Sequence, residues 1–101
     1  MGLIYPMSGK FIFYRKNVEP NSDIVEMKIW QVPHSAKNPQ GIKYSLVYIR
    51  DGQRLIGYDN AEGKGHHRHY RSLEKPYEFK GVDALIEDFY ADVETVRKGQ
   101  R

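Results

Sequence analysis

The fold is decided by the segment Ile42–Asp59, which reads IKYSLVYIRDGQRLIGYD. Its central dipeptide, Asp51-Gly52, is the strongest short signal for a β-hairpin, because both central residues of a type I′ turn need a positive φ. The residues on either side are rich in aromatic and β-branched side chains, which favour extended strands. The segment therefore predicts two antiparallel strands, 42–50 and 53–59, joined by a two-residue turn.

The length of this turn also predicts the register of the two strands. A two-residue turn places Arg50 opposite Gln53, and each step away from the turn then adds one facing pair. Counted in this way, Asp59 at the end of the second strand lies beside Tyr44.

Two more strands are expected before the hairpin. Residues 24–32 alternate in polarity, with Val25, Met27 and Ile29 on one side of the strand. Residues 11–14 are aromatic and β-branched, and they form a short partner strand across a polar turn. The sheet thus extends on the N-terminal side of the hairpin.

Beyond the hairpin, residues 66–72 can return as another strand, and an extended connector at 74–80 leads to a helix over 82–98. Gly81 is its expected N-cap and Gly99 the residue that follows its C-terminus. The apolar stripe at helical spacing comprises Val82, Leu85, Ile86, Phe89, Val93 and Val96. A helix of this length is marginal alone in water, so the stripe must pack on the sheet.

The predicted architecture is therefore α+β: an antiparallel meander of about five strands with one C-terminal helix packed on one face. The 101 residues form one domain. Within it, residues 1–10 are an irregular lead-in, 11–80 are mostly antiparallel sheet, and 82–98 are the helix.

Composition excludes several classes of protein. The chain has no cysteine, which removes disulfides, thiolate zinc sites and cysteine nucleophiles. No apolar run approaches the roughly 18 residues of a membrane span, and the N-terminus does not read as a secretory signal. The expected location is the cytoplasm, with no membrane association.

The net charge of +3 is unevenly distributed. Residues 1–81 hold thirteen Lys and Arg against eight Asp and Glu, whereas residues 82–101 hold three against five. A cationic body suits an anionic partner, although an ordinary solvated surface would also explain it. The acidic residues expected on the solvent side of the helix are Asp83, Glu87, Asp88, Asp92 and Glu94.

The candidate chemistry lies in the polar stretch Tyr58–Arg71, which holds three of the four histidines. RNA cleavage by internal transfer needs a base for the 2′-hydroxyl, an acid for the leaving 5′-oxygen, and cations for the charge that builds on phosphorus. Imidazoles such as His67 and His69 suit the first two tasks, and Arg68 and Lys64 suit the third. The stretch therefore predicts an RNA site.

The neighbouring residues allow both functional and structural interpretations. Tyr44 and Tyr58 are candidate stacking surfaces for unpaired bases, or half-buried residues of the sheet. Asp59 and Asn60 can serve the site, or they can simply end the strand, since both types favour turns. Both alternatives stay open on these residues alone.

A metal is a further alternative for the same histidines. On a strand, His67 and His69 lie on one face about 6.5 to 7 Å apart, which allows chelation of a divalent ion if Asp59 or His34 completes the set. Two histidines and a carboxylate also occur on surfaces that bind no ligand. The pattern alone does not decide between these.

In combination, these motifs resemble the TumE family of small prokaryotic proteins. The resemblance runs from about Ile24 to Val96 and leaves out the N-terminal twenty residues. It rests on Lys43-Tyr44-Ser45-Leu46, Tyr58-Asp59-Asn60, Gly63-Lys64, His67-Arg68-His69, Glu74-x-Pro76-Tyr77-x-Phe79 and Leu85-Ile86-x-Asp88-Phe89. At His66 the family pattern often has an acidic residue, so the resemblance assigns no role there.

The resemblance implies the toxin half of a type II toxin-antitoxin pair, with a helix-turn-helix protein antitoxin as partner. By analogy with other such toxins it implies an activity on RNA. The positions carried over are Asp59, Asn60, Lys64, His67, Arg68 and His69.

Together the residues and the resemblance favour a toxin-like endoribonuclease that needs neither metal nor cofactor. His67 and His69 act as acid and base, Asp59 orients an imidazole, and Arg68 and Lys64 hold phosphate. The alternatives are a non-catalytic module that binds nucleic acid or antitoxin, and a metal-dependent nuclease. A homodimer is compatible with the sequence.

Overall fold

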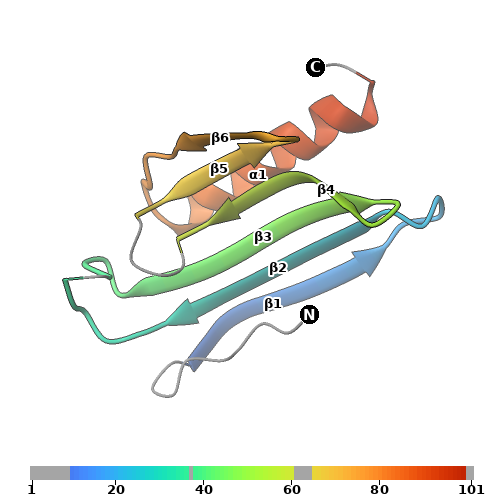
Figure 1. Ribbon diagram of the computed structural model, residues 1–101. Helices are drawn as coiled ribbons and strands as arrows, with labels where there is room; N and C mark the ends of the chain where they lie inside the picture. Colours follow the sequence, from blue (N-terminus) through green and yellow to red (C-terminus); the bar gives the residue numbers. More distant parts are fainter. Residues whose placement is uncertain (1–9, 37, 61–64, 100–101) are drawn as a thin grey trace.

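The structure, a computed structural model, describes residues 10–36, 38–60 and 65–99. These residues form a six-stranded antiparallel sheet in simple meander order, with one helix across one face (Figure 1). The strands are β1 Lys10–Val18, β2 Ile24–Gln31, β3 Ile42–Arg50, β4 Gln53–Asp59, β5 His67–Tyr70 and β6 Leu73–Pro76, and the helix is α1 Val82–Arg97. The α+β meander is confirmed, with one strand more than expected.

The extra strand is β6, whose residues were expected to be a connector. It pairs with β5 through a two-residue turn and forms one edge of the sheet. An edge strand tolerates proline at its end because one side of its backbone needs no partner in the sheet. Pro76 is therefore the last residue of β6 and does not prevent the pairing of this strand with β5.

The central hairpin has the predicted turn but a different register. Asp51 and Gly52 have φ of 53° and 76°, as a type I′ turn requires. Beyond the first two pairs a β-bulge shifts the register by one residue, so that Asp59 pairs with Ser45 and not with Tyr44. The predicted register is thus wrong beyond the bulge. Leu55 is the extra residue, and its burial in the core gives the bulge its physical reason.

Helix α1 begins at the predicted residue and ends one residue before the predicted Lys98, and four of the six residues of the predicted stripe are buried, while Val82 and Ile86 are partly buried. Gly81 is its N-cap, and Gly99 follows its C-terminus with a φ of 74°. The side chains buried in the core are Leu85, Phe89, Val93 and Val96, and they face β2, β3 and β4 residues that include Met27, Leu46, Ile56 and Tyr58. The expectation of a solvent-facing Asp92 is wrong, because that residue is only 9% exposed.

The sheet has two faces with different roles. We call the side covered by α1 the helix face and the other side the open face. Tyr58 and its paired neighbour Arg68 lie on the helix face, whereas Asp59, His67 and His69 alternate with them and lie on the open face. No helix in the described part of the chain is long and apolar enough to cross a membrane.

Candidate functional site on the open face

The pairing of β4, β5 and β6 gathers the two predicted histidines with two carboxylates. His67 pairs with Asp59 on β4, and His69 pairs with Glu74 on β6. All four side chains lie on the open face, because residues that pair across neighbouring strands point to the same side. The structure therefore brings together the three residues predicted to be catalytic, with Glu74 beside them.

Both ring nitrogens of His69 have a partner. The Nη2 of Arg54 lies 3.0 Å from Nδ1, and the Asp59 Oδ2 lies 3.3 Å from Nε2. A guanidinium can only donate, so Nδ1 accepts and the proton of the neutral ring is on Nε2, facing the carboxylate. The Asp59 carboxylate thus lies beside the Nε2 side of the ring, and its predicted role of orienting His69 stays a prediction.

Arg54 was missed from the sequence, and a glycine makes its position possible. A Cβ at Gly57 would lie 2.8 Å from the Cδ of Arg54, so the arginine side chain crosses the strand where there is no side chain below it. That path lets the Arg54 side chain reach His69 on the neighbouring strand. A glycine inside a strand often marks such a close approach, and this was the available signal.

His67 has a carboxylate partner of its own. Its Nδ1 lies 3.0 Å from the Glu74 Oε2, across the diagonal between β5 and β6. With the ring neutral and its proton on Nδ1, Glu74 accepts that proton's hydrogen bond and the lone pair is on Nε2. Glu74 was quoted in the family motif, but it gained no role because β6 was not expected.

Arg68 is not brought to the histidines. Its guanidinium lies on the helix face and donates to both carboxylate oxygens of Asp92, through Nε at 2.8 Å and Nη2 at 2.7 Å. A bidentate pair of this kind uses the donors that a phosphate would need. The geometry therefore assigns Arg68 to attaching α1 to the sheet.

The two predicted stacking tyrosines are buried. Tyr44 is 1% and Tyr58 2% exposed, so neither presents a ring face to a base. The Tyr58 hydroxyl donates to Asp92 at 2.7 Å. Burial raises the pKa of both phenols well above the ordinary value, so both are neutral donors in the fold.

Asn60 is also occupied inside the protein. Its Oδ1 accepts from the Tyr44 backbone N–H at 3.0 Å, and its Nδ2 donates to the Ile42 carbonyl at 2.7 Å. The side chain thereby continues the pairing of β3 past the end of β4. The geometry supports the strand-ending interpretation of this residue.

Two predicted features cannot be placed beside the histidines. Lys64 and residues 1–9 of the predicted lead-in 1–10 lie outside the described residues, whereas Lys10 is the first residue of β1. His66 stacks on Phe79 and has its Nδ1 2.9 Å from the Tyr44 hydroxyl. Burial, with a smaller effect of His67, lowers the pKa of His66 and favours its neutral form.

Comparison with known proteins identifies the family. A family model described as Toxin TumE matches residues 6–97. The chain belongs to the TumE toxin family. No curated protein and no solved structure gives a significant match.

The extent of the TumE match corrects one expectation. It begins at residue 6 and so includes β1, whereas the resemblance seen in the sequence left out the first twenty residues. β1 pairs along its length with β2, which makes it part of the family's sheet and not an addition to it. Membership of this toxin family implies that the protein has an antitoxin protein as its partner.

In this TumE-family chain, the residues that the structure describes contain no complete set of ligands for the metal ion considered above. No three histidine or carboxylate side chains there converge as ligands of one ion. His34, a suggested third ligand, has its Nδ1 2.7 Å from the Pro39 carbonyl in the loop between β2 and β3.

Proposed function

We propose that this TumE-family protein is a toxin that cleaves RNA without a metal ion, with His67 and His69 as its acid and base. The observation that carries the proposal is the matched pairing of two imidazoles on one sheet face. Each has one ring nitrogen against a carboxylate, Glu74 at 3.0 Å and Asp59 at 3.3 Å. Such pairs orient the rings and stabilise the imidazolium that forms when a ring takes up a proton.

The pairs suggest a division of labour. His67, with its Nδ1 proton directed at Glu74, takes the proton of the 2′-hydroxyl on Nε2. The 2′-oxygen then bonds to phosphorus and the bond to the 5′-oxygen breaks, which leaves a 2′,3′-cyclic phosphate. His69, protonated on Nδ1, gives its proton to the departing 5′-oxygen.

Proton donation by the Nδ1 of His69 requires Arg54 to move. Its guanidinium faces the Nδ1 of neutral His69, and protonation of that nitrogen replaces an attraction with a repulsion between two cations. The released guanidinium is then available for the charge that develops on the phosphate oxygens. Arg54 takes the role that the sequence interpretation gave to Arg68.

A non-catalytic function is the second candidate. It is favoured by the two partners of His69, which leave neither ring nitrogen of that residue open in this structure. On this alternative the same cationic surface binds RNA, or the antitoxin, without cleaving it. RNA binding that weakens steeply with salt, with no cleavage, would support it.

The remaining proposals rest on the family resemblance. We infer that the antitoxin is a helix-turn-helix protein and that the toxin acts in the cytoplasm, where its RNA substrates are. A homodimer stays a proposal that sedimentation of the purified protein would test.

The experiment is incubation of the purified protein with single-stranded RNA in EDTA. We expect cleavage, reduced about 100-fold or more by His67→Ala and by His69→Ala. His34→Ala is the matched control, since it removes an exposed imidazole in the loop between β2 and β3 and should leave the rate unchanged. Intact RNA, or equal rates in all variants, would overturn the proposal, and activity that needs added metal would favour the metal-dependent alternative.

A further inference from the structure

Two hollows flank the turn between β5 and β6. One, on the helix face, has a volume of about 510 Å³ and is lined by Arg68, Tyr70, Arg71, Ser72, Leu73 and Lys75. The other has about 470 Å³ and is lined by Gln53, Arg54, Leu55, Arg71 and Ser72. Arg71 and Ser72 line both, so the hollows meet at the turn.

Arg71 occupies an unusual backbone conformation. Its φ of 56° lies in the left-handed region, where glycine is favoured and an arginine is strained. The backbone is held there by a hydrogen bond from its N–H to the Leu55 carbonyl at the bulge, 2.8 Å long. A strained position that keeps a long cationic side chain suggests that the side chain has a function.

The cations around the turn are available to a ligand. The guanidinium of Arg71 and the ammonium of Lys75 make no hydrogen bond or ion pair within the described part of the chain. None of the described residues that line either hollow is acidic. Arg68 differs, since Asp92 already neutralises it.

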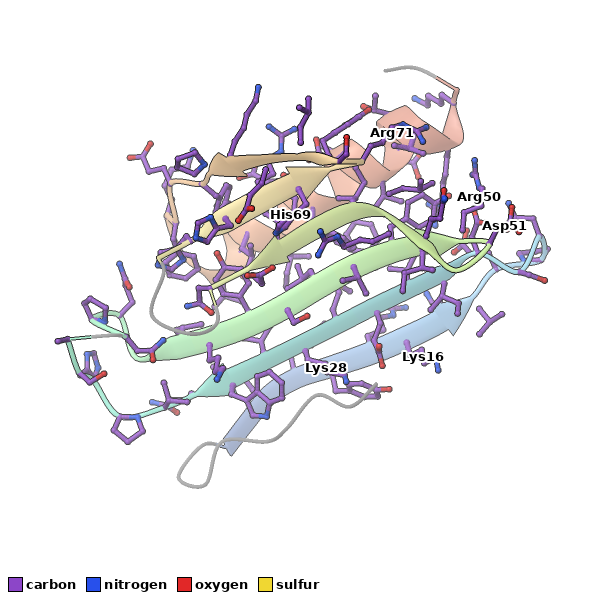
Figure 2. The ribbon with its side chains drawn as sticks, viewed as in Figure 1. Lys16, Lys28, Arg50, Asp51, His69 and Arg71 are labelled. Atoms are coloured by element: carbon purple, nitrogen blue, oxygen red, sulfur yellow. The ribbon has the colours of Figure 1, made fainter. Side chains whose placement is uncertain are left out.

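The cations also lead to the candidate site. Arg54 lines the second hollow and at the same time contacts His69. His69 and Arg71 lie on the same hairpin, with Arg71 at its turn (Figure 2). Positive groups are thus found beside the imidazoles at Arg54 on the open face, at the turn at Arg71, and on the helix face at Lys75.

We propose that Arg54, Arg71 and Lys75 form a track that binds successive phosphates of single-stranded RNA next to the cleaved bond. The inference rests on the proposed function, because the track is useful only to a protein that holds RNA at His67 and His69. A polyanionic backbone fits these cations, because no acidic residue among the described ones lines either hollow.

The test is the affinity of the full-length protein for a single-stranded RNA with 2′-O-methyl groups, which cannot be cleaved by internal transfer. Arg71→Gly removes the cation and also relieves the strain. We expect an unchanged or higher melting temperature together with a roughly tenfold weaker affinity and a salt slope smaller by about one. Lys16→Ala on β1 is the control for loss of a cation elsewhere, and it should bind like the wild type (Figure 2).

The outcomes separate this inference from the proposed function. Tight, Arg71-dependent binding by a protein that cleaves no RNA supports the track and refutes the nuclease. Cleavage with unchanged affinity in Arg71→Gly refutes the track and leaves the nuclease standing. The track would also be overturned if the wild type does not bind the RNA. It would equally be overturned if Arg71→Gly binds RNA as the wild type does and has a weaker affinity only for the antitoxin.

Discussion

At the scale of single residues, the two polar side chains at the C-terminal end of β4 have different partners: one contacts the candidate site and the other bonds the backbone. Asp59 faces His69 on the open face, whereas the next residue, Asn60, is 5% exposed and bonds the backbone of β3. The alternation of a strand sends neighbours to opposite sides, so two residues that look alike in sequence have different surroundings. Only the buried one has its hydrogen bonds satisfied by the main chain.

The first prediction concerns Asn60. Asn60→Ala leaves the Tyr44 N–H and the Ile42 carbonyl without their partner, and we expect the free energy of unfolding to fall by about 1 to 3 kcal/mol. Urea denaturation measures it. Asp59 is the preceding residue and is half-buried. Asp59→Ala should therefore lower the free energy of unfolding by less than Asn60→Ala does, and should reduce the rate of RNA cleavage by more. Equal stability of Asn60→Ala and the wild type would show that the amide has no structural role.

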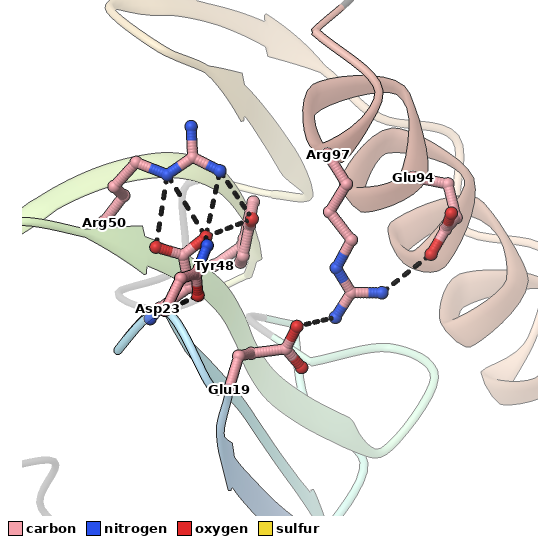
Figure 3. Close-up of polar contacts among 7 residues, drawn as sticks. Glu19, Asp23, Tyr48, Arg50, Glu94 and Arg97 are labelled. Atoms are coloured by element: carbon pink, nitrogen blue, oxygen red, sulfur yellow. Dashed lines mark hydrogen bonds and ion pairs between the residues drawn. The ribbon is translucent and has the colours of Figure 1, made fainter.

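At the scale of elements, polar contacts fix how α1 sits on the sheet. Near the middle of the helix, Asp92 accepts from Arg68 and Tyr58. At its C-terminus, Arg97 pairs with Glu94 of the helix and with Glu19 beyond β1, each at 2.7 Å (Figure 3). These contacts complement the apolar stripe, which has little directional preference of its own.

The second prediction is an energetic coupling between Arg68 and Asp92. Each single change to Ala leaves the other charge without its partner, and Asp92 is nearly buried. We therefore expect a double-mutant cycle to give a coupling of about 1 to 3 kcal/mol, reduced from the value of a fully buried pair because Arg68 is partly exposed. Strictly additive effects on the free energy of unfolding would contradict this contact.

The third prediction is a pH dependence of stability that comes from Asp23. This residue is 2% exposed and accepts from Arg50 and from the Tyr48 hydroxyl (Figure 3). The hydrogen bonds from Arg50 are the largest cause that lowers the pKa of Asp23 below its ordinary value of 3.8, and burial opposes them. Its contribution is therefore present above the ordinary pKa and lost as pH falls through the lower pKa of the folded state.

Urea unfolding of the wild type and Asp23→Asn across acidic pH would measure this contribution. We expect the difference in the free energy of unfolding to stay constant from about pH 7 to pH 5 and to shrink below about pH 4. A difference that does not change with pH would mean that the carboxylate charge is irrelevant.

At the scale of the whole molecule, local signals predicted the elements, and contacts between distant residues decided the rest. The Asp51-Gly52 turn and the helix ends follow from backbone preferences of a few neighbouring residues. The bulge at Leu55 depends on the core that α1 completes, so the shifted register could not be read from the turn. Local patterns therefore gave the meander but not its exact pairing.

The candidate site shows the same limit. Strand alternation predicted that His67 and His69 share a face, and the structure agrees. Which face α1 covers could not be predicted, and that choice sends Arg68 to Asp92 and leaves Arg54 with the histidines. The geometry therefore puts Arg54, and not the expected Arg68, beside the imidazoles and Asp59, and the roles of these residues stay predictions.

The central claim is that the groups that react with RNA lie on the open face, and that Arg68 on the helix face attaches α1 to the sheet. The most direct measurement is the rate of RNA cleavage in EDTA by Arg54→Gln and Arg68→Gln, at a temperature where both variants are folded. We predict that Arg54→Gln is slower by about tenfold or more, because the charge on phosphate loses its stabilisation, and that Arg68→Gln is as fast as the wild type. Loss of cleavage in Arg68→Gln with full activity in Arg54→Gln, or no cleavage by the wild type, would contradict the account.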